Sequence, residues 1–419
     1  MLTRLFGAFT VSSLILIFTA SSLFAQDTPA YCGQLDAADC ALLASSAEAM
    51  QDIQSVETES TMLLSLTDFP NMPFEELNIR YDQYSSVSIK PETLAFLKEF
   101  QGMTMLELEE RMSSPLYAFE YLETILTGMD LSVEMDLELS DELLDLINEQ
   151  VRSEFGVDLP ADLGLALKFV DGIVYLDMTT IAAMVPEIGM FVQGWVGVDS
   201  APLLEMAMSE MAAAGIDEDF QMDSTSELTN NPFAGLSMNQ TGPLVTVADE
   251  LDPTDESATY LSIERLEDAG ATEENVVAFR TTIDYNAFLK SNAFRELVYA
   301  IMTQDGATAT ADQLDETVTL AQIMAPPYLA DLQMEVVEQI AADNAYMVGG
   351  EFSLDWDLKA ALMTASLNDP SLQPDADGNP YFSLNTLTSN HNVNQELTIE
   401  PPDGAFVIPL EMLMALMNS

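Results

Sequence analysis

Few side chains in this sequence have the chemistry of a catalytic base or nucleophile. The only histidine is His391, which stands between Asn390 and Asn392 in a polar stretch. A nucleophile needs a base beside it, and the sequence contains neither a Gly-x-Ser-x-Gly turn nor a phosphate-binding glycine loop. We interpret His391 as a turn or strand-end residue, and we expect a protein that is not an enzyme and needs no cofactor.

Carboxylates are abundant, with 70 Asp and Glu residues. Paired carboxylates can hydrolyse glycosidic bonds, but at this abundance some pairs will lie close by chance and indicate nothing. The run Asp375-Ala376-Asp377-Gly378-Asn379 resembles a calcium loop. It lacks the third ligand before the glycine and the late glutamate of an EF-hand. We expect an exposed hairpin turn there and no metal site.

The two cysteines, Cys32 and Cys40, lie close together near the N-terminus. Two cysteines without a nearby histidine make a poor zinc site. In an exported protein the first expectation is a disulfide between them.

Residues 1–25 have the pattern of an export signal. Arg4 provides the positive start, an apolar stretch runs from Leu5 to Ala20, and Ala25 offers a small residue for cleavage before Gln26. The alternative is an uncleaved membrane anchor, because the apolar stretch approaches spanning length. The residues before Cys32 lack the lipoprotein pattern, so we expect no lipid anchor. The predicted location is the periplasm, the cell surface or the medium, without stable membrane insertion after cleavage.

The charge is strongly negative, with 12 Lys and Arg against 70 Asp and Glu and a formal net charge of −58. Such a surface repels nucleic acid and anionic bilayers. It attracts cations or a basic partner, and it also keeps a protein hydrated in salty surroundings. Both interpretations of the acidity stay open.

Alternation of apolar and polar residues is the strongest structural signal, because it is typical of strands with one buried face. Residues 163–169, Asp171-Gly172 and residues 173–178 have the pattern of a hairpin with a tight turn. Further strands are predicted where apolar side chains alternate: Leu131 to Leu139, Val277 to Tyr285, Phe352 to Leu358, Met62 to Leu66, and Val393 to Ile399.

Helices are predicted between the strands, over residues 115–126, 141–156, 201–214, 286–302 and 327–342. We therefore expect an α+β fold: a large curved antiparallel sheet, or open half-barrel, with helices covering its concave face. The predicted organisation is a signal peptide at 1–25, an N-terminal disulfide segment at 26–50, and one half-barrel domain at 51–419. Helical insertions are expected at about 91–128 and 201–255.

Three apolar sets are predicted to line this concave face, since burial fixes which face of a strand is apolar. They are the candidate ligand-binding residues: Val174, Leu176 and Met178; Val277, Phe279, Ile283 and Tyr285; and Phe352, Leu354 and Trp356.

Several segments, in order, resemble the LppX/LprG-like exported lipid-binding proteins, which have the LolA-like lipoprotein-carrier fold. They are Val170-Asp171-Gly172-Ile173-Val174-Tyr175-Leu176, then Gly194 to Asp199, Val277 to Asp284, and Asn394 to Pro402. The resemblance implies a half-barrel under helices and carries over no catalytic residues. The lipoprotein cysteine of that family is missing here.

We therefore expect a non-catalytic exported protein that binds or carries a hydrophobic small molecule or lipid. An apolar cavity under incompletely covering helices would hold it. The alternative is an exported structural or interaction domain with a packed core and no cargo.

The charge imbalance predicts a response to salt. If the carboxylates mainly repel one another, raising salt to about 1 M should raise the melting temperature, because the Debye length shrinks to about 3 Å. Calorimetry over a salt series measures this. A melting temperature that does not change with salt would mean that the acidic groups are already paired or too far apart to interact.

Overall fold

The computed structural model describes residues 32–72, 75–101, 103, 111, 115–184, 194–202, 260–266, 275–303, 310–329, 331–367, 369–375, 378–409 and 412. Its contacts group the chain into two compact units. Unit 1 comprises Met1–Gln51, Leu63–Leu77 and Asn230–Leu387. Unit 2 comprises Asp52–Met62, Asn78–Thr229 and Thr388–Ser419. A single domain over 51–419 stays a prediction.

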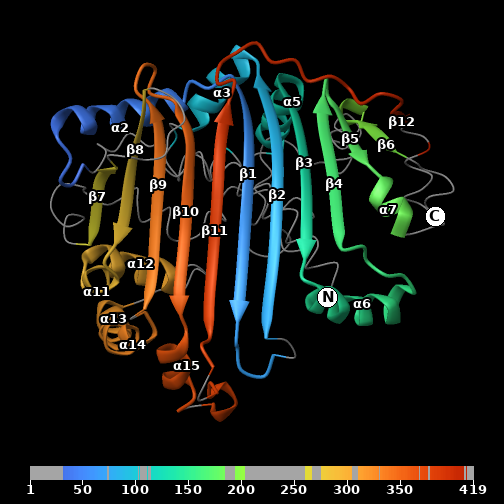
Figure 1. Cartoon of the computed structure of the whole chain (residues 1–419). Coiled ribbons are helices and arrows are strands. Elements are labelled where there is room, and N and C mark those ends of the chain that lie inside the picture. Colours follow the sequence, from blue (N-terminus) through green and yellow to red (C-terminus); the bar gives the residue numbers. More distant parts are fainter. Residues whose placement is uncertain are drawn as a thin grey trace. The chain divides into compact units, whose positions relative to one another are not determined.

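Twelve strands form one open sheet in the order β12-β6-β5-β4-β3-β2-β1-β11-β10-β9-β8-β7. Antiparallel pairing joins β2 through β6 in succession and β7 through β10 in succession, whereas β12 runs parallel to β6. Helices join many of the strands (Figure 1). This confirms the predicted α+β class with a large antiparallel sheet that does not close.

The strands are β1 (Ser55–Thr67), β2 (Glu76–Ile89), β3 (Met129–Leu139), β4 (Asp162–Val170), β5 (Ile173–Asp177), β6 (Trp195–Asp199), β7 (Leu261–Leu266), β8 (Val276–Ile283), β9 (Leu332–Ala341), β10 (Met347–Asp357), β11 (Tyr381–His391) and β12 (Phe406–Ile408). The described helices are α2 (Ala37–Met50), α3 (Pro91–Gln101), α5 (Pro115–Gly128), α6 (Asp141–Phe155), α7 (Thr179–Met184), α11 (Tyr285–Phe288), α12 (Asn292–Thr303), α13 (Ala311–Met324), α14 (Pro326–Leu329), α15 (Lys359–Ala365) and the short 3-10 turn Pro370–Leu372.

In unit 2 the predicted hairpin forms β4 and β5. Asp171 and Gly172 both have positive φ, 51° and 81°, as a two-residue type I′ turn requires. The turn sets the register, in which Val170 pairs with Ile173 and Phe169 pairs with Val174. β3 then pairs with β4 so that Leu131 faces Phe169. Because directly paired residues share a face, this register aligns the apolar residues of neighbouring strands.

Helix α6 begins and ends where the sequence predicts. Ser140 stands at its N-cap position but makes no side-chain cap hydrogen bond, and Asp141 and Glu142 lie in the first turn. Gly156 ends the helix in the left-handed conformation with φ 73°. Acidic residues beside the N-terminal N–H groups are favoured by the helix dipole.

In unit 1, α2 lies across the ends of β7, β8 and β9, and α11 to α14 lie at the opposite ends of these strands (Figure 1). Asp36 caps α2 by accepting from the backbone N–H groups of Ala38 and Asp39, both at 2.9 Å. Arg265 of β7 donates to Asp39 at 2.7 Å. The capped helix is therefore also tied to the edge strand by an ion pair.

Cys32 and Cys40 form a disulfide, as predicted, and it joins the segment before α2 to the first turn of the helix. The predicted signal peptide lies outside the described residues. Within the described ranges, no helix has the length and apolar character needed to cross a membrane.

Several predicted elements are wrong. Residues 393–399 form no strand and run as irregular backbone, with Asn392 and Asn394 at positive φ. The helix predicted over 327–342 is only α14, and β9 occupies most of that segment. Tyr285 does not continue β8, because Asp284 caps α11 at that point by accepting from the Ala287 N–H. The helix predicted over 201–214 lies largely outside the described residues.

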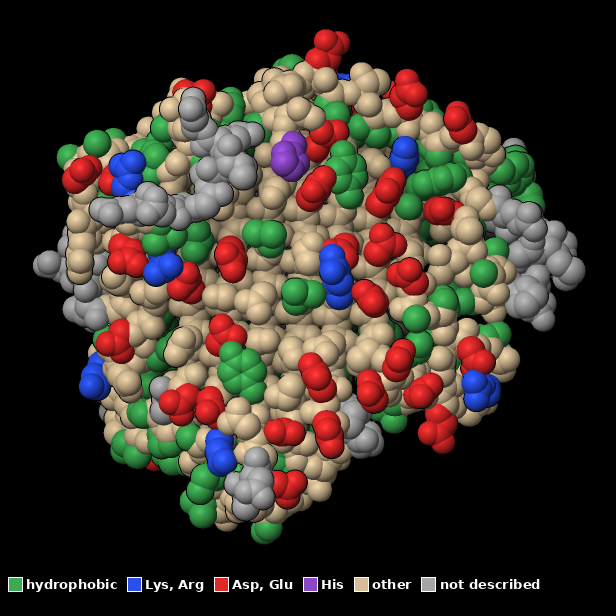
Figure 2. Space-filling model, in the orientation of Figure 1, with side chains coloured by type: hydrophobic (Ala, Val, Ile, Leu, Met, Phe, Trp, Pro, Cys, Tyr) green, Lys and Arg blue, Asp and Glu red, His purple; other side chains and the backbone are tan. Residues whose placement is uncertain are grey.

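Acidic side chains dominate the charged groups on the face shown in Figure 2. Most ion pairs among the described residues, such as Arg280 with Glu335 at 2.9 Å, have partly or largely exposed side chains. The exception is Arg265 with Asp39, since the Asp39 side chain is only 11% exposed. Exposed pairs of this kind contribute about 0–1 kcal/mol each. The described part of the fold therefore depends on apolar packing much more than on its charges.

The packing of Phe279 gives a stability prediction. Its side chain is 0% exposed, so Phe279→Ala should lower the free energy of unfolding by about 3–5 kcal/mol through lost burial and a residual cavity. Phe352→Ala is the control, because Phe352 lies on the same sheet face but is partly exposed, and its cost should be clearly smaller. Urea unfolding measures both. Equal costs would contradict the packing described here.

Candidate functional site

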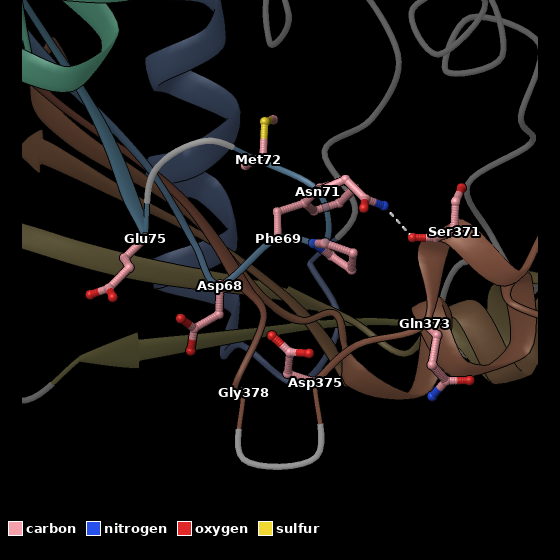
Figure 3. Close-up of a pocket in the computed structure, with 10 residues that line it drawn as sticks. Asp68, Phe69, Asn71, Met72, Glu75, Ser371, Gln373, Asp375 and Gly378 are labelled. Carbon is pink, nitrogen blue, oxygen red and sulfur yellow. Dashed lines mark hydrogen bonds between the residues drawn. The ribbon is translucent and has the colours of Figure 1, made fainter.

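A polar pocket of about 350 Å³ lies in unit 1 between the β1–β2 turn and the segment after α15. Figure 3 shows its labelled residues, including the carboxylates of Asp68, Glu75 and Asp375. The Asn71 side-chain amide donates to the Ser371 carbonyl oxygen. These side chains come from two stretches that are distant in the sequence.

The pocket has no catalytic arrangement among the residues that the structure describes. Asp68 accepts from the backbone N–H of Asn379 at 2.9 Å, so one carboxylate is used to hold the two segments together. No group of three or more acidic, histidine or cysteine side chains in the described ranges is placed to hold a metal ion. In the calcium-like run, the Gly378 N–H donates to the Asp375 carbonyl at 3.1 Å, and residues 376–377 lie outside the described residues. His391 is the exposed last residue of β11.

An apolar sheet face is the second candidate in unit 2. The registers of β2 to β6 place side chains in rows across the strands, such as Ser85–Val133–Leu167–Leu176–Val196. The centre of this face is closed: Val133 is 1% exposed and Phe169 is 4% exposed. Towards the edge, Leu167, Val174 and Leu176 are only partly buried. The side chains of this face are therefore buried at β3 and only partly buried at β5.

The opposite face of β5 is packed by the C-terminal segment. Tyr175 is buried with Val170 and Ile399, and Leu397 packs against them. Gly197 leaves room for the Tyr175 ring, since a Cβ there would lie 2.8 Å from the ring. The irregular segment predicted as a strand thus serves as a cover for this face.

Unit 1 has a corresponding apolar face. Thr281, Val336 and Phe352 form one row across β8, β9 and β10. Met334 pairs with Leu354, and Leu332 pairs with Trp356. Val277, Phe279 and Ile283 alternate along β8 on the same face. Phe279 and Ile340 are closed off, while Val277, Phe352, Leu354 and Trp356 are partly exposed.

One acidic residue interrupts this face. Glu338 is the β9 partner of Phe279 on one side and of Gly350 on the other. Burial raises the pKa of its carboxyl from the ordinary 4.5 to about 7. No hydrogen-bond or ion-pair partner of this carboxyl occurs among the described residues. Glu338 is partly buried, like Val336 on the same face. An unpaired carboxyl among apolar side chains is unusual, and it marks this face as a candidate binding site.

The predicted site residues are distributed over both units. The structure brings Val277, Phe279 and Ile283 onto one face with Phe352, Leu354 and Trp356, in unit 1. Val174 and Leu176 lie on the apolar face of unit 2. Met178 follows the end of β5, and Tyr285 begins α11, so neither belongs to the strand on which it was expected. That these residues bind a ligand stays a prediction.

Sequence reasoning missed Glu338 because it missed β9. The pair Val336-Val337 is β-branched, which favours a strand. However, Glu338 occupies an apolar-face position of β9 and breaks the alternation that identified the other strands. The Asn344-Ala345 turn, with Ala345 at φ 60°, was the remaining signal of a hairpin with β10.

Comparisons with protein-family models, with curated proteins and with solved structures found no match to this chain. The resemblance to the LppX/LprG-like proteins therefore stays a prediction, and the proposed function is argued from the arrangement of the side chains described above.

The raised pKa of Glu338 predicts pH-dependent stability. Below about pH 4.5 the carboxyl is neutral in both states; as pH rises to about 7 it ionises in the unfolded chain first, so stability falls. Glu338→Gln removes this loss. The variant should exceed the wild type by at most about 3 kcal/mol in unfolding free energy near pH 8, with no gain near pH 4.5.

The control is Glu351→Gln, which removes the same charge from an exposed position on the other face of β10. Denaturant titrations at the two pH values measure the difference. A gain for Glu338→Gln that is the same at both pH values would contradict desolvation as the cause.

Proposed function

We propose that this protein binds or carries a hydrophobic molecule, such as a lipid or acyl chain, outside the cytoplasm and without catalysis. The observation that carries the proposal is the apolar face of unit 1. Aromatic and aliphatic side chains of β8 and β10 share that face, and several stay partly exposed. Apolar side chains that gather on one face and stay partly exposed are typical of a binding surface.

The disulfide supports an oxidising location. Cys32–Cys40 lies near the start of the described chain, and disulfides persist in exported proteins but are rare in the cytosol. The acidic composition is consistent with a highly hydrated exterior. We therefore place the proposed binding step in the periplasm, at the cell surface or in the medium.

A second candidate is a structural or interaction domain without cargo. The closed positions Phe279, Ile340 and Val133 favour it, because they are packed as in an ordinary core. The two candidates differ at the partly exposed residues, which contact a ligand in the first case and only solvent or protein in the second.

The two tryptophans allow a direct test. Trp356 lies on the apolar face of unit 1, and its Nε1 donates to the Tyr328 carbonyl at 3.0 Å. Trp195 lies in unit 2, with the Lys168 ammonium 5.9 Å from its ring centroid. The variants Trp195→Phe and Trp356→Phe each leave one reporter, because the chain has 2 tryptophans.

Titration with a brominated long-chain alcohol should quench Trp356 in the first variant, because bromine must approach the ring. Trp195 in the second variant is the matched control and should keep its fluorescence. Native mass spectrometry of the exported protein from its own host should show a co-purifying lipid. Unquenched Trp356 together with a ligand-free mass would support the structural alternative.

A further inference from the structure

Glu338 has an apolar neighbour on one side and a glycine, which has no side chain, on the other. Phe279 packs beside it on β8, and Gly350 stands beside it on β10. A Cβ added to Gly350 would meet only the Val337 backbone oxygen within 4 Å, at 3.1 Å. Among the described residues, no side chain lies within 4 Å of that position. Next to the Glu338 carboxyl, the apolar face therefore has one position without a side chain.

No charged group of the described chain is available to neutralise Glu338. Along β9 its same-face neighbours are Val336 and Ile340, and the facing positions on β8 and β10 are not titratable. Arg265 lies one strand further, across Phe279, and is bound to Asp39. Helix α2, which contacts β9, carries only Asp39 and Glu48 as charged groups.

We propose that the ligand of the apolar face in unit 1 is a cationic amphiphile, whose ammonium head binds Glu338 while its chain follows the partly exposed side chains of Phe352 and Leu354. The inference rests on the proposed function, because it names the chemical class of the ligand at that same face.

The choice of a cationic head follows from charge. An ionised carboxylate among apolar side chains is costly unless a cation pairs with it. An anionic head would meet Glu338 without a free cation among its described neighbours, and the whole chain, at −58, would repel it. A neutral head would leave the carboxylate unpaired. Only a cationic head is both attracted by the negative charge of the protein and able to pair with the Glu338 carboxylate.

The raised pKa supports this ligand class. A carboxyl that titrates near 7 ionises in the physiological range and gains most from a cation above that pH. Binding of a permanently charged head should therefore strengthen as pH rises through about 7 and weaken as pH falls below it. Binding of a neutral chain should not follow this profile.

Three probes with the same chain length test the inference: dodecyltrimethylammonium, dodecanol and dodecanoate. Quenching or shift of Trp356 fluorescence in the Trp195→Phe protein reports binding to this face. Near pH 8 the cation should bind at least about tenfold tighter than dodecanol, a difference of about 1.4 kcal/mol. Dodecanoate should bind more weakly than dodecanol.

Glu338→Gln should abolish the preference for the cation and its pH dependence, while dodecanol still binds. Glu351→Gln is the control for the general attraction of cations to an acidic protein, and it should keep the preference. If Glu338→Gln does not fold, the inference is tested by the pH dependence of dodecyltrimethylammonium binding to the protein with Glu338 intact. The trimethylammonium head does not titrate, so any pH dependence comes from the protein.

The outcomes separate the two proposals. Equal binding of dodecyltrimethylammonium and dodecanol, both above and below pH 7, would overturn the cationic ligand but leave the proposal of hydrophobic binding intact. An unchanged preference in a folded Glu338→Gln protein also overturns it. Failure of all three probes to bind at this face overturns both proposals.

Discussion

Strand register is the constraint on which the other features of this protein depend. In unit 2, Val133 pairs with Ser85 on one side and with Leu167 on the other. In unit 1, Val336 joins Thr281 to Phe352 in the same manner. A slip of one residue in either place would exchange an apolar face for carboxylates and hydroxyls. The burial of a few central residues therefore determines where the partly exposed apolar residues lie.

The same register explains why a protein with so many carboxylates can pack a core. In β3, acidic residues and Ser132 alternate with Leu131, Val133 and Met135, so the polar and the apolar residues lie on different faces. The charge is then carried by the solvated face, where ion pairs and water screen it. Glu338 departs from this separation, because it places a carboxyl on the apolar face, and its pKa is raised as a direct result.

The sheet is packed by other segments of the chain at β5 and at the end of β7 to β9, but less completely along β10. The irregular segment around Leu397 and Ile399 covers Tyr175 on β5, helped by the space above Gly197. Arg265 and Asp39 fix α2 near the end of β7 to β9. Along β10, Phe352 and Leu354 stay partly exposed. A binding function depends on this incomplete coverage, because a ligand can replace only solvent and not a packed side chain.

The sequence by itself determined the elements whose signals are local. The alternation in 131–139, the Asp171-Gly172 turn, the Gly156 helix end and the pairing of Cys32 with Cys40 all depend on residues within a few positions of one another. Only the tertiary structure decided that β1 lies beside β11 and that β9 carries Glu338 on its apolar face. Pairing between distant strands has no local signature. A carboxyl at an apolar-face position breaks the period that identifies a strand, so its place became visible only through the strands on either side.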